Sequence, residues 1–128
     1  MEQKQLHLGE AELEIMQQLW AKDLPLTANQ ILSGISGRKW ALSTLMTVLN
    51  RLADKGFLTC DRGGKTNLYT PLIKESDYQA AANRNFLERM YGNSVPRLVA
   101  SLYESHCMTE EDVQSLREYL DRLEKGEV

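Results

Sequence analysis

Apolar residues recur at helical spacing in three successive stretches of the first half of the chain. The first, residues 10–22, places apolar side chains every three or four positions at Leu13, Ile15, Met16, Leu19 and Trp20. The second, residues 27–37, opens with Thr27 and Gln30 at the spacing of a capping box and ends in glycines. The third, residues 43–55, places its leucines and valine at 45, 48, 49 and 52, on one side of a helix. Three amphipathic helices are predicted.

After Gly56 the apolar repeat changes from 3.6 residues to two. The runs "FLTC" (57–60) and "TNLYTPL" (66–72) favour β-strands, and the intervening "DRGGK" (61–65) carries paired glycines that suit a tight turn. The pattern predicts an antiparallel hairpin. Three short helices followed by a hairpin with a basic tip are typical of a winged helix-turn-helix domain.

Beyond residue 73 the pattern is helical again, with starts expected at Ser76, Ser94 and Thr109. Such short amphipathic helices expose apolar faces that a second copy of the chain would cover. The residues expected at this dimer interface are Phe86, Leu87, Met90, Leu98, Leu102, Val113, Leu116, Leu120 and Leu123. The alternative for the last helix is that its short apolar seam packs within its own chain.

The pattern therefore predicts a mainly α fold with a small β-hairpin wing. An N-terminal winged helix-turn-helix domain is expected over residues 1–73, followed by a C-terminal three-helix dimerisation domain over residues 74–128. The chain has 128 residues, 42% of them hydrophobic and 26% charged, which is ordinary for a globular protein. It has no long apolar run and no signal-peptide pattern, so a cytoplasmic protein without a membrane partner is expected.

The net charge of −3 conceals an uneven distribution along the chain. Residues 38–65 contain six basic residues against two acidic ones, a local charge of +4. Residues 73–128 contain seven basic residues against eleven acidic ones, a local charge of −4. A basic segment on an acidic chain indicates a DNA-binding face joined to a module that does not bind DNA.

The polar face of the third helix carries the candidate DNA contacts. Residues near the start of a helix that enters the major groove reach the base edges, which assigns Ser43, Thr44 and Thr47 to base reading. The residues expected at the DNA backbone are Arg38, Lys39, Asn50, Arg51, Lys55, Arg62 and Lys65. Trp40 is expected in the core, with a phosphate contact through its indole N–H as the alternative.

The sequence offers little support for catalysis. His7 and His106 are isolated, and neither a metallopeptidase motif nor a phosphate-binding glycine loop is present. The chain is expected to be no enzyme and to need no cofactor or metal. Two alternatives stay open beside DNA binding. One is a winged-helix module that docks another protein, and the other is a metal-responsive repressor that uses His106 and Cys107.

Five segments together resemble the penicillinase-repressor family, the BlaI/MecI/CopY group of winged-helix repressors. They are "AELEIMQQLW" (11–20), "W…STLMTVLNRLADKGFL" (40–58), "YTP" (69–71), "SDY" (76–78) and "FLERMYG" (86–92). The resemblance implies a homodimeric repressor on a dyad-symmetric operator, with Thr44, Thr47 and Arg51 at the DNA. The third helix would lie in the major groove and the wing, residues 61–66, on the backbone.

The sequence departs from the family pattern in three places. Antibiotic-responsive members are released by a regulatory protease under a membrane sensor, but their scissile Asn-Phe pair falls here on Ala100-Ser101. Copper-responsive members carry Cys-x-Cys, whereas this C-terminal region has only Cys107. The cleavage mechanism is therefore not carried over, a regulatory protease or sensor stays open as a partner, and copper sensing is not expected. The third helix lacks the usual Ser-Pro-Lys start after Trp40, so Ser43 is expected to be its cap.

Overall fold

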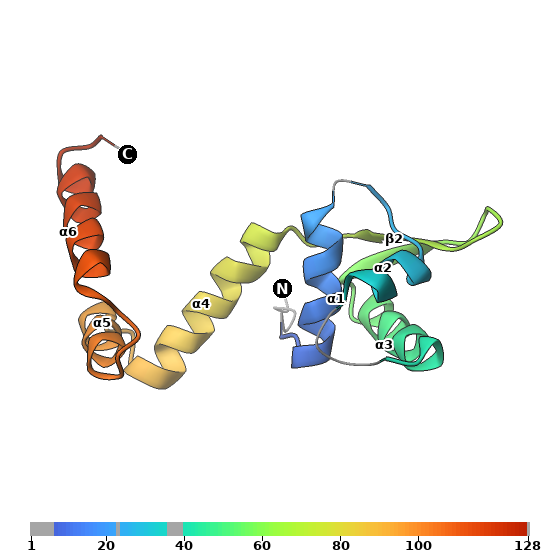
Figure 1. The fold of residues 1–128 in the computed structure, drawn as a ribbon, viewed down its shortest axis with the longest axis horizontal. Coiled ribbons are helices and arrows are strands. Elements are labelled where there is room, and N and C mark those ends of the chain that lie inside the picture. Colours follow the sequence, from blue (N-terminus) through green and yellow to red (C-terminus); the bar gives the residue numbers. More distant parts are fainter. Residues whose placement is uncertain (1–6, 23, 36–39, 128) are drawn as a thin grey trace, which may run out of the picture. The chain divides into compact units, whose positions relative to one another are not determined.

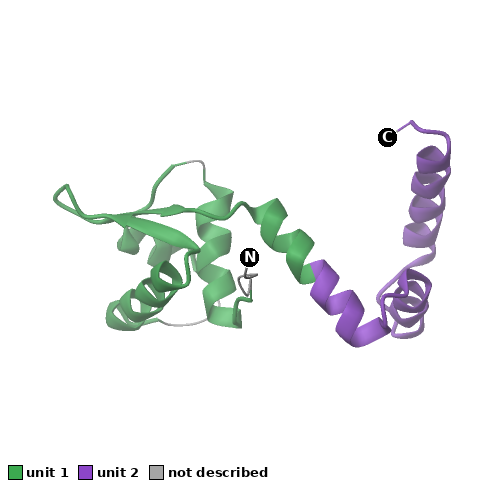
Figure 2. Ribbon diagram, turned by 180° about the vertical axis from the view of Figure 1, so that it is seen from behind, with its two compact units in different colours: residues 1–82 green, residues 83–128 purple. Residues whose placement is uncertain are grey.

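The computed structural model describes residues 7–22, 24–35 and 40–127, and these residues form six helices and one two-stranded sheet (Figure 1). The helices are α1 (Glu10–Ala21), α2 (Ala28–Gly34), α3 (Leu42–Asp54), α4 (Glu75–Tyr91), α5 (Val95–Glu104) and α6 (Glu110–Glu124). The strands are β1 (Leu58–Asp61) and β2 (Leu68–Pro71). The predicted class, mainly helical with one hairpin, is confirmed. The chain divides into two compact units, residues 1–82 and residues 83–128 (Figure 2).

The N-terminal unit has a single apolar core to which its three helices and its hairpin all contribute. The core residues are Leu8, Ile15, Met16, Leu19, Leu26, Ile31, Leu45, Val48, Leu49, Leu52, Phe57, Leu58 and Tyr69. Trp20 and Trp40 are partly buried and pack against this core. The core assignment of both tryptophans is therefore confirmed. The stripe predicted for α1 is also confirmed, because Ile15, Met16 and Leu19 have no exposed surface.

The predicted capping box starts α2. The Thr27 hydroxyl accepts a 3.1 Å hydrogen bond from the Gln30 amide, and the Gln30 side-chain oxygen accepts one of 2.8 Å from the Thr27 amide. These two bonds satisfy amides that the first turn of a helix otherwise leaves without partners. The capping box therefore sets the residue at which α2 begins after the connection from α1.

The hairpin pairs as predicted. β1 and β2 are antiparallel, with Leu58 opposite Pro71 and Asp61 opposite Leu68. Leu26, in the segment before α2, exchanges two main-chain hydrogen bonds of 2.8 and 3.1 Å with Tyr69. Tyr69 is almost fully buried, so this bridge fastens the outer side of β2 to the body of the unit. The loop of residues 62–67 is left to project as the wing.

The division between the two units falls inside α4, after Ala82, and not at the expected boundary of 73 and 74. The first turns of α4 belong to the N-terminal unit because the Tyr78 ring packs there. Its centroid lies 5.7 Å from that of Trp20 and 6.1 Å from that of Phe57. The helix starts at Glu75, with a hydrogen bond from the Tyr78 amide to the Lys74 oxygen, so the prediction that Ser76 is the cap was wrong.

The C-terminal unit contains the rest of α4 and the helices α5 and α6. The predicted caps are confirmed, since Ser94 accepts from the Arg97 amide and Thr109 from the Asp112 amide. The Tyr91 hydroxyl donates a 3.1 Å hydrogen bond to the hydroxyl of Ser101, which joins α4 to α5. In the described part of the chain, no helix combines the length and the apolar character needed to cross a lipid bilayer.

Candidate nucleic-acid interface

The helix α3 separates its residues into a buried face and an exposed polar face. Leu45, Leu49 and Leu52 have no exposed surface, and Val48 is 6% exposed. The opposite face is exposed and carries Ser43, Thr44, Thr47, Asn50 and Arg51. The structure therefore places all five of these predicted contact residues at the surface of one helix. The buried stripe holds that helix to the core, so its polar face is turned away from the core.

The start of α3 differs from the prediction. Ala41 takes the N-cap position with extended backbone, and its carbonyl oxygen accepts a 3.1 Å hydrogen bond from the Leu45 amide. Ala41 has no side-chain oxygen, so no side chain caps the helix. The expectation that Ser43 is the cap was wrong. Ser43 lies inside the first turn, and its exposed hydroxyl is not spent on the helix start.

Thr47 lies one turn further along the exposed face. Its hydroxyl donates a 3.1 Å hydrogen bond to the main-chain oxygen of Ser43. The hydroxyl proton is thus committed within the helix. The oxygen lone pairs and the methyl group stay available to an outside partner, as an acceptor and as an apolar contact.

The end of α3 is a Schellman motif around Gly56, whose φ is 85°. The Gly56 amide donates to the Ala53 oxygen and the Phe57 amide to the Leu52 oxygen, both at 3.0 Å. The predicted end of the third helix at residue 55 is confirmed, since Lys55 is its C-cap. Only a residue without a β-carbon adopts this backbone readily, so Gly56 fixes the direction in which the chain enters the wing.

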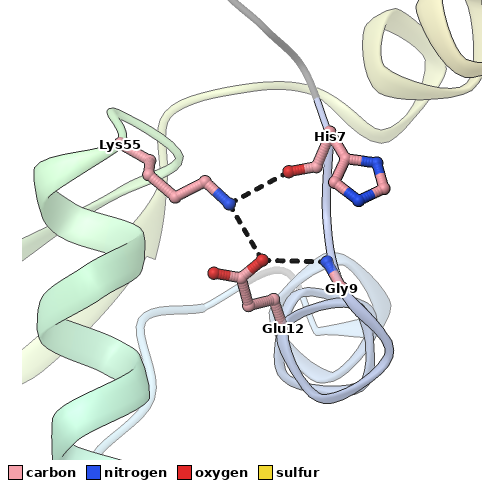
Figure 3. A network of polar contacts seen from close by, with 4 residues as sticks. All are labelled: His7, Gly9, Glu12 and Lys55. Carbon is pink, nitrogen blue, oxygen red and sulfur yellow. Dashed lines mark hydrogen bonds and ion pairs between the residues drawn. The ribbon is translucent and has the colours of Figure 1, made fainter.

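The Lys55 ammonium is bound by oxygen atoms of the protein itself (Figure 3). Its Nζ donates to Glu12 Oε1 at 2.9 Å and to the main-chain oxygen of His7 at 3.0 Å. The Glu12 side chain is 7% exposed and that of Lys55 33% exposed. The same Glu12 oxygen accepts a 2.9 Å hydrogen bond from the Gly9 amide. The structure therefore gives Lys55 an internal partner, where the sequence assigned it to the DNA backbone.

The Glu12 carboxylate is kept ionised by its neighbours. Burial raises the pKa of Glu12, but the Gly9 amide and the Lys55 ammonium donate hydrogen bonds to the charged form. The positive charges of Lys55 and Arg51 act in the same direction. The balance lowers the pKa of the Glu12 carboxyl below its ordinary value of 4.5. At neutral pH the end of α3 therefore faces a fixed negative charge on α1.

Glu12 is the residue that the sequence analysis missed. It lies on the apolar stripe of α1, three and four positions before Ile15 and Met16. A carboxylate on such a stripe signals a buried charge that needs a partner. It is also the third residue after the cap Gly9, where a glutamate reaches back to the cap amide. Both signals are local, but neither identifies Lys55 as the partner.

The wing presents its two basic residues to solvent. Arg62 and Lys65 are exposed, and the Asp61 carboxylate accepts a 2.9 Å hydrogen bond from the Gly63 amide, which tightens the turn. Arg38 and Lys39 lie outside the described residues. In Figure 1, α3 and the tip of the hairpin both lie at the right-hand end of the N-terminal unit. One end of this unit thus carries both predicted DNA-contacting elements.

The nine residues predicted at a dimer interface form no core of their own. No residue of α4, α5 or α6 is fully buried, and all three helices lie within the described residues. Phe86, Met90, Leu120 and Leu123 are 46 to 59% exposed. Leu87, Leu98, Leu102, Val113 and Leu116 are half-buried. A groove of about 500 Å³ runs between α5 and α6, and Val113 and Leu116 line it.

The turn between α5 and α6 holds His106 and Cys107, the residues of the metal-responsive alternative. Both are exposed, and the Cys107 sulfur lies 3.4 Å from the Ser105 hydroxyl. Among the residues that the structure describes, no three histidine, cysteine or acidic side chains gather in a way that could hold a metal ion.

Comparison with known proteins assigns the family. The model of the penicillinase repressor family matches residues 8–122. The chain is 31% identical to the penicillinase repressor of Bacillus licheniformis over 115 residues, 89% of each chain. It is 29% identical to the methicillin resistance regulatory protein MecI of Staphylococcus aureus (strain N315) over 123 residues, which are 95% of this chain and 99% of that one.

The solved structures give a matching result for the N-terminal part. The solution structure of the DNA binding domain of the repressor BlaI is 34% identical, with a TM-score of 0.50. The match covers 61% of this chain and 94% of that domain. About six tenths of the chain therefore have the fold of a repressor's DNA-binding domain. Since the family match spans both units, the chain belongs to the penicillinase repressor family, whose members are transcriptional repressors and not enzymes.

Proposed function

We propose that the protein is a homodimeric, sequence-specific DNA-binding repressor that binds a dyad-symmetric operator. In this proposal α3 enters the major groove, with Ser43, Thr44 and Thr47 at base edges. Asn50 and Arg51 contact the phosphate backbone beside them. Arg62 and Lys65 of the wing, with Arg38 and Lys39, contact the backbone on either side. Lys55 is left out of the contact set, because its ammonium is bound to Glu12.

The observation that carries the proposal is the exposed polar face of α3 opposite a fully buried stripe. A helix with a purely structural role needs the buried apolar stripe, and its opposite face can carry any polar residues. Here that face begins with three exposed hydroxyls and continues to an exposed arginine, Arg51. Such groups hydrogen-bond to base edges and phosphates. The likeness to the DNA binding domain of BlaI supports the same use of this face.

The proposed dimer interface is the helical unit. Its helices are amphipathic, yet none of them buries a residue fully, and the groove between α5 and α6 is lined mainly by apolar side chains. A second copy would cover these faces and would contribute the same residues by two-fold symmetry. Two DNA-binding units joined in this way match an operator with two inverted half-sites.

The proposal places the protein in the cytoplasm, where a bacterial repressor meets its DNA. It includes no proteolytic release step. Ala100 and Ser101, at the position of the scissile pair in antibiotic-responsive relatives, are consecutive residues in the interior of α5.

Selection of bound duplexes from a random pool tests DNA binding and dimer symmetry together. The full-length protein is mixed with the pool at low salt, and the retained duplexes are sequenced after several rounds. We expect enrichment of two inverted half-sites, separated centre to centre by about one helical turn or a multiple of it. A control selection uses the Thr44→Ala, Thr47→Ala double variant, which should lose the base preference while still binding duplex through phosphate contacts.

Each outcome decides one part of the proposal. Absence of any duplex binding at low salt would contradict the DNA-binding function. Enrichment of a single half-site without its inverted copy would contradict the dimeric mode but not DNA binding. A control selection that returns the same site as the unchanged protein would contradict the assignment of base reading to the start of α3.

A further inference from the structure

The contact between Glu12 and Lys55 joins two ends of helices that are 43 residues apart in the sequence. Glu12 lies in the first turn of α1, and Lys55 is the residue at which α3 ends. The Lys55 Nζ also binds the main-chain oxygen of His7 and lies 5.8 Å from the centre of the Phe57 ring. The C-cap residue of α3 is thus held from several directions (Figure 3).

The rest of α3 is held mainly by apolar packing, with one weak hydrogen bond of 3.9 Å from the Tyr69 hydroxyl to the Met46 sulfur. Its start has no side-chain cap, and its core contacts come from aliphatic side chains. Aliphatic contacts are non-directional, whereas a charge-assisted hydrogen bond fixes distance and angle. The ion pair therefore adds a directional constraint between α1 and the C-terminal end of this helix.

A buried ion pair is weak evidence for stability in general, because removing both charges from water offsets most of their attraction. Fixing one arrangement among several is a better-attested role for such a pair. Loss of alignment matters for a helix that reads DNA, because the proposed hydrogen bonds of Ser43, Thr44 and Thr47 to base edges weaken steeply with small changes in distance and angle.

We propose that Glu12 is a positioning residue for DNA recognition, which acts by holding Lys55 and so fixes the direction of α3 in the groove. The inference rests on the proposed function, because it concerns how well the helix fits its operator. Glu12 itself touches no DNA. Lys55, for its part, serves the alignment of the helix and not the neutralisation of a phosphate.

The direction in which one substitution changes DNA affinity separates this role from a long-range electrostatic effect. Glu12→Gln keeps the shape of the side chain and an oxygen that can accept from Gly9, but it removes a negative charge from the DNA-binding unit. Long-range electrostatics alone would make the variant bind DNA more tightly. Loss of alignment would make it bind more weakly. The two explanations therefore predict opposite changes in affinity.

The experiment measures the affinity of the full-length protein for a duplex recovered by the selection, at several salt concentrations. The variants are Glu12→Gln, Lys55→Met and the double variant, all at a temperature where circular dichroism shows them folded. We expect each single variant to bind about fivefold to tenfold more weakly, with an unchanged dependence on salt. The double variant should bind DNA no more weakly than whichever single variant has the lower affinity, because both substitutions remove the same constraint.

Two further variants separate an effect on stability from an effect on the position of α3. Ile15→Val removes one buried methyl group from the same helix α1 and should lower stability while leaving affinity within twofold. Glu12→Asp retains the charge but shortens the reach toward Lys55. It should show a smaller loss of affinity in the same direction, and it provides the test if Glu12→Gln does not fold.

Other results would overturn the inference. Unchanged or tighter binding by Glu12→Gln, or by Glu12→Asp in its place, would exclude a positioning role. A salt dependence that falls by about 0.9 per half-site in Lys55→Met would show that Lys55 neutralises a phosphate. If the unchanged protein binds no duplex from the pool, the proposed function itself fails, which is a distinct result.

Discussion

The indole nitrogen of Trp20 donates a 2.9 Å hydrogen bond to the main-chain oxygen of Ile73, which lies just before α4. The Trp20 ring also packs against Tyr78 in the first turns of that helix. The Trp20 side chain therefore contacts both the segment that follows β2 and the first turns of α4. This arrangement explains why the N-terminal unit continues to Ala82.

Replacing Trp20 by phenylalanine tests this connection. The variant loses the hydrogen bond to Ile73 and part of the ring contact, so we expect a loss of about 1 to 3 kcal/mol in the free energy of unfolding. Urea unfolding of the full chain measures it, followed by the fluorescence of Trp40, which packs against the same core. Leu24→Ala is the control, because Leu24 is 71% exposed and should change stability by less than about 0.5 kcal/mol. An equal effect of both substitutions would contradict the role of Trp20.

The sequence allowed most of the local structure to be predicted. The two faces of α3, the caps at Thr27 and Thr109 and the hairpin follow from rules that involve neighbours within a few residues. The failure at Ser76 has a physical reason. The capping-box spacing also fits residues inside a helix, and the packing of Tyr78 on Trp20 extends α4 back to Glu75.

The partner of Lys55 could not be predicted in the same way. Periodicity places a basic residue at the end of a helix, where it suits both the helix dipole and a nearby phosphate. Its choice of Glu12 depends on how α1 packs against α3, which no local pattern specifies. A charged residue on the buried stripe of α1 was the available signal, and it shows that a departure from the apolar pattern is informative.

The stability of the protein should depend on pH through Glu12. Its pKa is lowered in the folded state, so its contribution is fully present above the ordinary value of 4.5 and is lost as the pH falls through the lower folded value. We expect the difference in unfolding free energy between the protein and Glu12→Gln to be largest near neutral pH and to shrink below pH 4.5. Urea unfolding of both at neutral and acidic pH measures this. A difference that stays constant would contradict the lowered pKa.

Thr47 should affect which base pairs are bound more than how tightly duplex is bound. Its hydroxyl proton is committed to Ser43, so its lone pairs and its methyl group are the groups offered to a base. We expect Thr47→Ala to change the preference at one position of each half-site by about 1 to 3 kcal/mol, with an unchanged salt dependence. Competition between duplexes that differ at single positions measures it. Equal losses on all duplexes would instead indicate a backbone contact.

Arg51 should show the opposite behaviour, because the proposal places its exposed guanidinium at a phosphate. We expect Arg51→Ala to weaken binding to all duplexes alike and to lower the slope of log affinity against log salt by about 0.9 per half-site. Arg84→Ala, at an exposed position on α4, is the matched control and should leave the slope unchanged. A slope that does not change in Arg51→Ala would remove this residue from the backbone contacts.

The dimer proposal makes a prediction for Leu120, which is 50% exposed on the apolar seam of α6. A two-fold dimer contains each substitution twice, so Leu120→Asp removes two buried leucines and places two charges in the interface. Lost burial alone amounts to about 1.5 to 3 kcal/mol, because Leu120 is already half-buried, and this raises the dissociation constant of the dimer about 10-fold to 100-fold. Sedimentation equilibrium measures this constant, and circular dichroism checks that the helices persist. Ser115→Asp adds the same charge at an exposed position of α6 away from the seam and should dimerise like the unchanged protein. If both variants dimerise equally well, the seam of α6 does not form the interface.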